Sequence, residues 1–330
     1  MKVAFFSARS YDTAYFQNNT SPHQFTFIKE KLDAITVKFA ESHDAICISA
    51  QDIADEPVLK ELLSMELNFI VVRASGTDNV DMGMAFNNDI TVKWLPGFSP
   101  RAIAEHAAAL LLALNRKILI ASERVKHADF SIEGLMGFNL YQKTVGIIGS
   151  GRVGSAFAEI MRGFGCQILI NDTKKNINML HNGIHVVNLS ELLQQSDIIS
   201  LHCSLNDTSE AIINTRTLQS VKPGTILINT ARGKLVDTIA VLEALDKGLL
   251  GAYGTDVYEH ENNFFYQTFE SMDDVDDPVL KELIKHPSVL LTSHQAFFTK
   301  EAMRQMAQTV INDLTYQENL TGGLSDRLMI

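Results

Sequence analysis

Four ionisable side chains in the second half of the chain each stand after a short apolar run: Arg232, Asp256, Glu261 and His294. An arginine stays charged and can bind a carboxylate through a two-pronged hydrogen bond. A histidine can transfer a proton near neutral pH, and a neighbouring carboxylate would keep its imidazole protonated and oriented. Together these groups suit the reduction of a 2-keto acid.

Each of these side chains also has a less specific interpretation. Arg232 could be the partner of a structural ion pair, and spacing alone does not select Glu261 from its ionisable neighbours. Among the ten histidines, His202 also follows an apolar run and is the main competitor of His294. It could instead line a cofactor site. His106 lies within an apolar helical stretch and is expected to be packed.

A glycine-rich turn begins at Gly149, between an apolar run and a stretch with helical spacing. Its sequence, Gly-Ser-Gly-Arg-Val-Gly, fits the GxGxxG pattern, which is specific for dinucleotides only in this strand-turn-helix context. Gly149 would permit the tight turn, Gly151 the approach of a pyrophosphate, and Gly154 the close packing of the helix. The alternative is a structural turn without a ligand.

Asp172 closes the next apolar run and could select the cofactor. Its carboxylate could accept hydrogen bonds from an adenosine ribose and would repel a 2′-phosphate, so NAD is expected rather than NADP. Lys174 and Lys175 follow closely and would weaken this preference. The alternative is an Asp at the surface without a ligand.

The elements that must carry these residues alternate between strands and helices. The first strands are predicted at residues 3–6, 45–49, 69–72 and 90–93, and the first helices near 11–17 and 57–65. A long helix is predicted at 101–126, and its apolar middle indicates burial between domains. Later strands are predicted at 144–148, 167–170, 184–187, 197–201, 225–228, 251–254 and 289–291, before a final helix at 299–317. This alternation predicts an α/β fold with doubly wound parallel sheets, which bind ligands at the carboxyl ends of their strands.

Length and composition narrow the class of protein. A chain of 330 residues favours two domains, and its net charge of −11 disfavours a nucleic-acid partner. The three cysteines are far apart and form no metal-binding or disulfide pattern, which indicates a reducing compartment. No signal peptide or membrane span is predicted, so we expect a cytoplasmic protein without a metal or a membrane partner.

These motifs resemble the D-isomer-specific 2-hydroxyacid dehydrogenase family over essentially the whole chain. The matching stretches are residues 73–81, 103–107, 149–154, 229–233, 256–261 and 294–297. The sequence at 256–259, the Phe264-Phe265 insert and residues 294–297 resemble most closely the D-lactate dehydrogenase branch. The resemblance implies NADH-dependent reduction of pyruvate to D-lactate. Two alternatives stay open: a dehydrogenase for a bulkier acid such as 2-ketoisocaproate, and a nucleotide-sensing corepressor on the same fold.

The resemblance also implies roles for individual residues. Arg232 would bind the substrate carboxylate and polarise the keto group, His294 would be the general acid and base, and Glu261 would pair with His294. The residues implied to contact the cofactor are Gly149, Gly151, Arg152, Val153, Gly154, Asp172, Cys203, Ser204, Thr230, Ala231, Arg232 and, at the nicotinamide end, Asp256. The residues implied to contact the substrate are Ser75, Gly76, Phe98, Arg232 and His294.

The fold implied by the resemblance has two domains with the active site in the cleft between them. Residues 1–99 with 299–330 would form a smaller, flavodoxin-like substrate domain, and residues 100–298 a Rossmann-type cofactor domain. A homodimer or homotetramer is expected. Three residues depart from the family pattern: Phe98 stands where Tyr is frequent, Ser204 where Pro is, and Ser209 where Asn is. These departures bear on substrate affinity and on the strength of cofactor binding.

Overall fold

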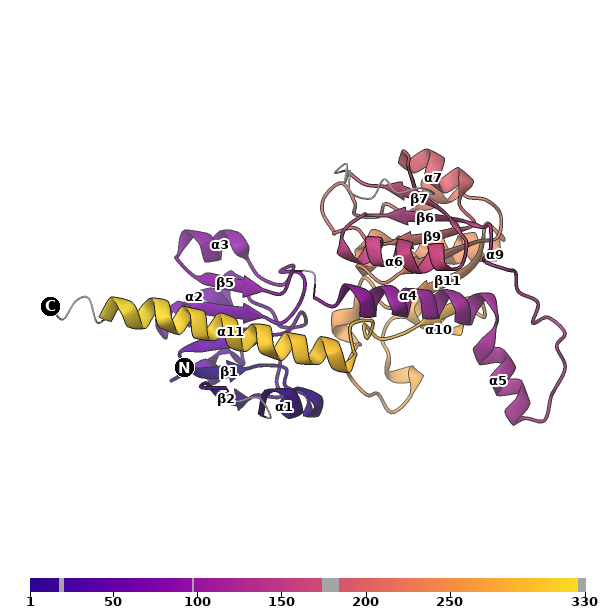
Figure 1. The fold of residues 1–330 in the computed structure, drawn as a ribbon. Coiled ribbons are helices and arrows are strands. Elements are labelled where there is room, and N and C mark those ends of the chain that lie inside the picture. The colour runs from indigo at the N-terminus through magenta and orange to yellow at the C-terminus, as the bar shows by residue number, and fades with distance from the viewer. Residues whose placement is uncertain (18–20, 97, 174–183, 326–330) are drawn as a thin grey trace. The chain divides into compact units, whose positions relative to one another are not determined.

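The computed structural model describes residues 1–17, 21–96, 98–173 and 184–325, with side chains to residue 320. The chain divides into two compact units, one made of Met1–Ser99 with Phe298–Ile330 and the other of Pro100–Phe297. Each unit carries one parallel β-sheet with helices packed on it (Figure 1). The predicted α/β class with two parallel sheets is therefore confirmed.

The smaller unit contains a five-stranded sheet in the order β2-β1-β3-β4-β5. Its strands are β1 (Lys2–Phe5), β2 (Gln24–Phe27), β3 (Ala45–Ile48), β4 (Phe69–Val72) and β5 (Thr91–Trp94). Its helices are α1 (Ser10–Gln17), η1 (Val37–Ala40), α2 (Glu56–Ser64), α3 (Met82–Asn87) and α11 (Lys300–Ser325). Every residue of β3 and β4 is buried, as in parallel strands covered on both faces.

Besides the short 3₁₀ helix η1, a strand and a helix of the smaller unit are absent from the sequence prediction. Strand β2 lies at the edge of the sheet and alternates exposed and half-buried residues, so it has no continuous apolar run. Helix α3 has only 6 residues, too few to establish a helical period. The C-terminal helix α11, predicted to end near residue 317, continues to Ser325.

The larger unit contains a seven-stranded sheet in the order β12-β11-β10-β9-β6-β7-β8. Its strands are β6 (Thr144–Ile148), β7 (Gln167–Asn171), β8 (Ile184–Val186), β9 (Ile198–Leu201), β10 (Thr225–Asn229), β11 (Leu250–Thr255) and β12 (Val289–Leu291). All of the strands predicted here are present. The strand order reverses direction beside β6, so the carboxyl end of β6 is where a doubly wound sheet binds its ligand.

Helices cover both faces of this sheet. They are α4 (Pro100–Asn115), α5 (Ile118–Lys126), α6 (Arg152–Gly163), α7 (Leu189–Gln195), α8 (Thr215–Leu218), α9 (Thr238–Asp246) and α10 (Pro278–Lys285), with short 3₁₀ turns η3 (Gly233–Leu235), η4 (Glu261–Asn263) and η5 (Met272–Asp274). Alternate strand residues belong to two separate hydrophobic clusters, one shared with α4 and α6 and the other with α7, α9 and α10. Figure 1 shows α4 and α6 side by side.

The prediction of a single long helix at 101–126 is wrong. Helix α4 ends at Asn115, Lys117 has a left-handed φ of 49°, and α5 begins at Ile118. The side chain of Asn115 donates to the carbonyl of Phe138 at 2.8 Å and accepts from its N–H at 3.0 Å, which ends the helix against a distant segment. The apolar middle of α4 packs on α6, β10 and β11 of its own unit, which accounts for its burial.

Within the described residues, no helix is both long and apolar enough to span a membrane. No group of three or more His, Cys, Asp or Glu side chains in that part of the chain could hold a metal ion. The cysteines Cys47, Cys166 and Cys203 are all free thiols.

Candidate active site

Three neighbouring strands of the larger sheet deliver the three predicted catalytic residues to one edge. Arg232 follows β10, Glu261 follows β11 and His294 follows β12, and these strands are adjacent and parallel. Because the carboxyl ends of parallel strands meet at the same edge, the side chains come together although up to 62 residues separate them (294 − 232). The larger unit therefore assembles this cluster by itself.

His294 and Glu261 form a direct pair. Nδ1 of His294 lies 2.5 Å from Oε1 of Glu261, and the two side chains are 24% and 20% exposed. Burial lowers the pKa of His294, but the hydrogen bond and charge of Glu261, helped by Asp256, outweigh burial and the nearby charge of Arg232 and raise that pKa. The second oxygen of Glu261, Oε2, accepts a hydrogen bond from the N–H of Tyr258 at 2.9 Å. The arrangement therefore favours a protonated imidazole in a fixed orientation.

Asp256 holds the backbone around His294. Its carbonyl accepts the N–H of His294 at 2.7 Å, while its carboxylate accepts the N–H groups of Gln295 at 2.9 Å and Ala296 at 2.7 Å. The hydroxyl of Thr292 donates to the same carboxylate at 2.5 Å. Burial raises the pKa of Asp256, but these hydrogen bonds outweigh it and lower that pKa. Asp256 is therefore an ionised anchor for the segment that carries His294.

His106 belongs to the same polar network, although the sequence indicates only a packed histidine. From α4, its Nε2 lies 3.0 Å from the hydroxyl of Thr292 and 3.5 Å from Oδ1 of Asp256. His106 therefore makes polar contacts that the expectation of a packed histidine does not include. Its signals in the sequence are a polar residue within an apolar helix and its place in the stretch 103–107 that resembles the family. The contact of Asp256 with nicotinamide stays a prediction.

A buried asparagine shapes the loop of Arg232. The side chain of Asn229 donates to the carbonyl of Arg232 at 2.9 Å and accepts the N–H of Ala231 at 3.1 Å. Asn229 itself is fully buried. A Cβ on Gly233 would collide with the backbone of residues 258–259, so the loops after β10 and β11 pack directly on each other. Sequence reasoning missed Asn229, which has no chemistry of its own and acts on its neighbours.

The glycine-rich turn joins β6 to α6 as a dinucleotide site requires. Gly149 has φ +98°, and a Cβ on it would lie 2.5 Å from the backbone nitrogen of Cys203. A Cβ on Gly154 would collide with the carbonyl of Gly149, so the helix packs closely on the turn. A Cβ on Gly151 would meet open space, which leaves room beside the start of α6 for a pyrophosphate. These features fit a bound dinucleotide.

Asp172 is tied to this turn. Its Oδ2 accepts hydrogen bonds from both the N–H and the hydroxyl of Ser150, each at 2.6 Å. The carboxylate that was predicted to contact the ribose thus lies beside the predicted pyrophosphate site. Lys174 and Lys175 lie outside the described residues.

Other predicted cofactor residues lie at the ends of β9 and β10. Cys203 is half-buried and Ser204 is exposed, and the hydroxyl of Ser209 donates to the carbonyl of Ser204 at 2.8 Å. The hydroxyl of Thr230 is buried and has no hydrogen-bond partner among the described residues. Because such a group is costly to leave unpaired, Thr230 is suited to bind a ligand. Ala231, beside it, is half-buried.

His202 does not suit the role of proton donor. Its Nε2 lies 2.8 Å from the hydroxyl of Ser200, and its ring packs against Phe157. Burial lowers the pKa of His202 to about 3, so this imidazole stays neutral near pH 7. The structure therefore favours His294 over its competitor.

The smaller unit holds the other predicted substrate residues. Ser75 and Gly76 lie in the loop after β4, and within the described residues their N–H groups have no hydrogen-bond acceptor. Asn79 anchors the end of that loop by donating to the carbonyls of Ser49 at 2.9 Å and Asp52 at 2.8 Å. Phe98, near the end of the same unit, is only 7% exposed.

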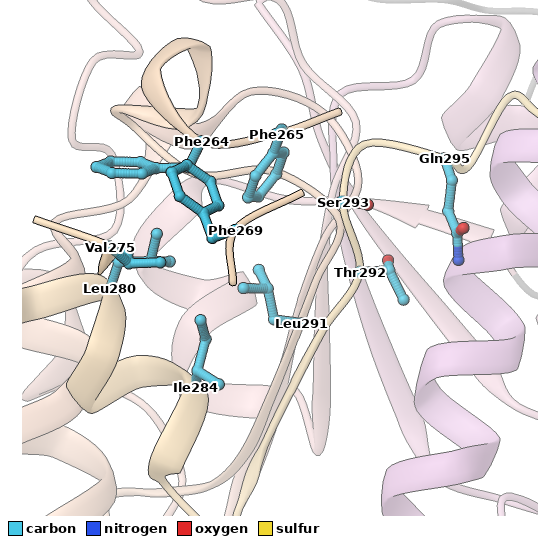
Figure 2. Close-up of a pocket in the computed structure, with 10 residues that line it drawn as sticks. All are labelled: Phe264, Phe265, Phe269, Val275, Leu280, Ile284, Leu291, Thr292, Ser293 and Gln295. Atoms are coloured by element: carbon cyan, nitrogen blue, oxygen red, sulfur yellow. The ribbon is translucent and has the colours of Figure 1, made fainter. Parts of the chain in front are cut away.

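A cavity of about 330 Å³ adjoins the segment of His294 (Figure 2). It is lined by Phe264, Phe265, Phe269, Val275, Leu280, Ile284, Leu291, Thr292, Ser293 and Gln295. The three phenylalanine rings come from residues 264–269, a segment that begins with the predicted Phe264-Phe265 insert (hereafter the insert), and they gather on one side, facing Leu291. Ser293 and Gln295, the two chain neighbours of His294, also line this space.

The comparisons with known proteins show the family to which this chain belongs. Residues 108–296 match the NAD-binding domain of D-isomer specific 2-hydroxyacid dehydrogenases. With relatives of 34–40% identity that are matched over nearly their whole length, the chain belongs to the D-isomer specific 2-hydroxyacid dehydrogenase family. It is an oxidoreductase of this family, and its cofactor is NAD.

Particular relatives indicate which branches are similar. D-lactate dehydrogenase from Escherichia coli is 38% identical over 96% of this chain and 97% of its own. A solved D-lactate dehydrogenase with NAD⁺ from Lactobacillus jensenii has a TM-score of 0.81 and 32% identity, with 97% of both chains covered. A solved D-2-hydroxyisocaproate dehydrogenase has a TM-score of 0.83 and 31% identity, with 98% of both chains covered.

Proposed function

We propose that this protein reduces pyruvate to D-lactate with NADH, and catalyses the reverse reaction with NAD⁺. The observation that carries the proposal is the cluster of Arg232, Glu261 and His294 at one edge of the NAD-binding unit. The similarity to D-lactate dehydrogenase from Escherichia coli supports pyruvate as the substrate.

The residues that would hold the cofactor surround the carboxyl ends of β6, β7, β9 and β10. They are Gly149, Gly151, Arg152, Val153, Gly154, Asp172, Cys203, Ser204, Thr230 and Ala231, with Arg232 and Asp256 toward the nicotinamide. When bound, the reduced nicotinamide supplies a hydride. The orphaned hydroxyl of Thr230 and the open space beside Gly151 support these assignments.

The proton for the keto oxygen comes from His294. Glu261 occupies Nδ1 of the imidazole, so Nε2 is the atom that gives up the proton. The keto carbon gains the hydride, its oxygen gains the proton from Nε2, and the ring is left neutral. In the reverse direction the neutral ring accepts the hydroxyl proton. The charge of Glu261 stabilises the protonated ring before each reduction.

Arg232 binds the substrate carboxylate and polarises the keto group. Its planar guanidinium matches a carboxylate in geometry. We extend the proposal to the smaller unit, where the N–H groups of Ser75 and Gly76 would also bind the carboxylate and Phe98 would lie beside it.

The substrate proposal has one competitor within the same chemistry. The similarity to D-2-hydroxyisocaproate dehydrogenase favours a bulkier acid such as 2-ketoisocaproate. A corepressor that only senses the nucleotide would have no use for a protonated His294 next to Arg232, so catalysis is preferred. We also propose a homodimer or homotetramer, which size-exclusion chromatography with light scattering would determine.

The test is the oxidation of NADH, followed by its absorbance, with a panel of 2-keto acids. The highest kcat/KM is expected for pyruvate, with D-lactate as the product on chiral chromatography. A higher kcat/KM for 2-ketoisocaproate would select the alternative. L-Lactate, or no turnover with any 2-keto acid, would refute the proposal.

A further inference from the structure

The insert contacts His294 through the side chain of Tyr266. The hydroxyl of Tyr266 donates to the backbone carbonyl of His294 at 2.5 Å. The two rings lie 6.5 Å apart between centroids and are tilted by 31°.

The contact falls on a backbone position that needs support. His294 has φ 51°, in the left-handed region that residues with a Cβ rarely adopt. Such conformations persist only where surrounding contacts fix them, and they are frequent at active sites. The peptide unit before His294 is fixed by its N–H bond to the carbonyl of Asp256.

The peptide unit after His294 is held from two sides. Its carbonyl accepts the hydroxyl of Tyr266, and its N–H, which belongs to Gln295, donates to the carboxylate of Asp256 at 2.9 Å. Two hydrogen bonds to one peptide unit define its plane. That plane fixes ψ of His294, and with it the direction in which the imidazole leaves the backbone.

On one side, the segment around His294 is not fixed by close packing. Ser293 and Gln295, which flank His294, both line the cavity of about 330 Å³ in Figure 2. Side chains next to empty space lose the close contacts that fix positions elsewhere in a protein interior. Hydrogen bonds must therefore hold the segment, and Tyr266 supplies the one that comes from the insert.

We propose that Tyr266 is a positioning residue for His294, and that its hydroxyl holds the imidazole where Nε2 can reach the keto oxygen. The inference rests on the proposed role of His294 as proton donor. Tyr266 touches the backbone of His294 and acts through it. The effect should therefore fall on the proton-transfer step and leave cofactor binding unchanged.

The experiment is the variant Tyr266→Phe, which keeps the ring and removes the hydroxyl. Loss of a single hydrogen bond of this kind should lower kcat by about three- to ten-fold. The KM for NADH and the melting temperature should stay unchanged. With NADH deuterated at C4, the isotope effect on kcat should rise, because chemistry becomes more rate-limiting. A merely structural role would not produce that rise.

The matched control is Gln267→Ala in the same insert. Gln267 is exposed, and its side chain donates to the carbonyl of Asn263 at 3.0 Å, away from His294. This variant loses a hydrogen bond of the insert without touching His294, so its kcat and isotope effect should equal those of the unchanged protein.

Three results would overturn the inference: unchanged kcat and isotope effect in Tyr266→Phe, the same losses in Gln267→Ala, or loss of NADH binding in Tyr266→Phe. The third would assign the hydroxyl to the stability of the fold. The variant His294→Ala separates the two proposals. If it retains normal turnover, the role of His294 fails; if it is inactive while Tyr266→Phe is normal, only the inference fails.

Discussion

The carboxylate of Glu261 lies 2.5 Å from Nδ1 of His294, and the opposite ring nitrogen, Nε2, has no partner within the described residues. One ring nitrogen is thus hydrogen-bonded to a carboxylate, and the other is available for proton transfer. Because the same carboxylate also accepts the N–H of Tyr258, it cannot turn away from the ring without losing a second bond.

This relationship predicts a shift of the pH profile in Glu261→Gln. The charge of Glu261 raises the pKa of His294, and its removal leaves only the charge of Asp256 to oppose burial and Arg232, both of which lower that pKa. Reduction of pyruvate needs the protonated ring, so activity is lost as pH rises through this pKa. The alkaline limb should therefore move to lower pH in the variant. Oxidation of D-lactate needs the neutral ring, and its acidic limb should move in the same direction. A profile that stays in place would remove Glu261 from this role.

Replacing each of the two competing histidines should separate them by kinetics. His294→Ala removes the proton donor and should lower kcat by at least about 100-fold, the lower bound for general acid catalysis. His202 stays neutral near pH 7 because burial lowers its pKa, so His202→Ala should keep the pH dependence of turnover. Steady-state rates across pH provide the measurement. An active His294→Ala beside an inactive His202→Ala would reverse the assignment.

Asp172 should make the protein prefer NADH to NADPH, because its charge repels a 2′-phosphate. The informative variant is Asp172→Asn, which removes the charge and keeps an oxygen to accept the hydrogen bonds of Ser150. The ratio of kcat/KM for NADPH to that for NADH should rise several-fold. Asp207→Asn, at an exposed position in the same unit, is the control and should leave the ratio unchanged. Equal use of both cofactors by the unchanged protein would contradict the prediction.

Phe98→Tyr should lower the KM for pyruvate. The added hydroxyl could donate to the substrate carboxylate, and a hydrogen bond to a charged group contributes about 1.5–3 kcal/mol, or roughly a factor of 10 to 100 in affinity. Uniform binding of this kind changes KM with little effect on kcat. Phe98 is only 7% exposed, so packing alone is the competing explanation for the ring. An unchanged or higher KM at saturating NADH would favour packing.

The sequence predicts those parts of the fold that depend on local pattern. Buried parallel strands appear as apolar runs. The turn at Gly149 is visible because local sterics require Gly149 and Gly154, and Gly151 leaves room for a ligand. Strand β2 is not predicted because it is a half-exposed strand at the edge of its sheet. The break in the helix after Asn115 is not predicted because the residue that causes it, Phe138, lies 23 residues further along the chain.

The site residues also divide into those that the sequence predicts and those that depend on distant parts of the chain. His294 and Arg232 stand out because their chemistry is distinctive and they follow apolar runs. Tyr266 and His106 do not, since their importance comes from partners 28 and 186 residues away that only the fold brings near. Asn229 has close partners but an ordinary side chain. Positioning residues can therefore be identified only from the three-dimensional structure, whereas reacting residues can be identified from their side-chain type and their position after a strand.

Arg232, Glu261 and His294 all belong to the unit that matches the NAD-binding domain, and the loop of Ser75 and Gly76 belongs to the other. Under the proposed roles, the residues that transfer the proton belong to one unit, and some of the residues that bind the substrate acid belong to the other. Substitutions in the smaller unit can then change which acid is accepted while the acid strength of His294 is preserved. A family built in this way can diversify its substrates without inventing its chemistry again.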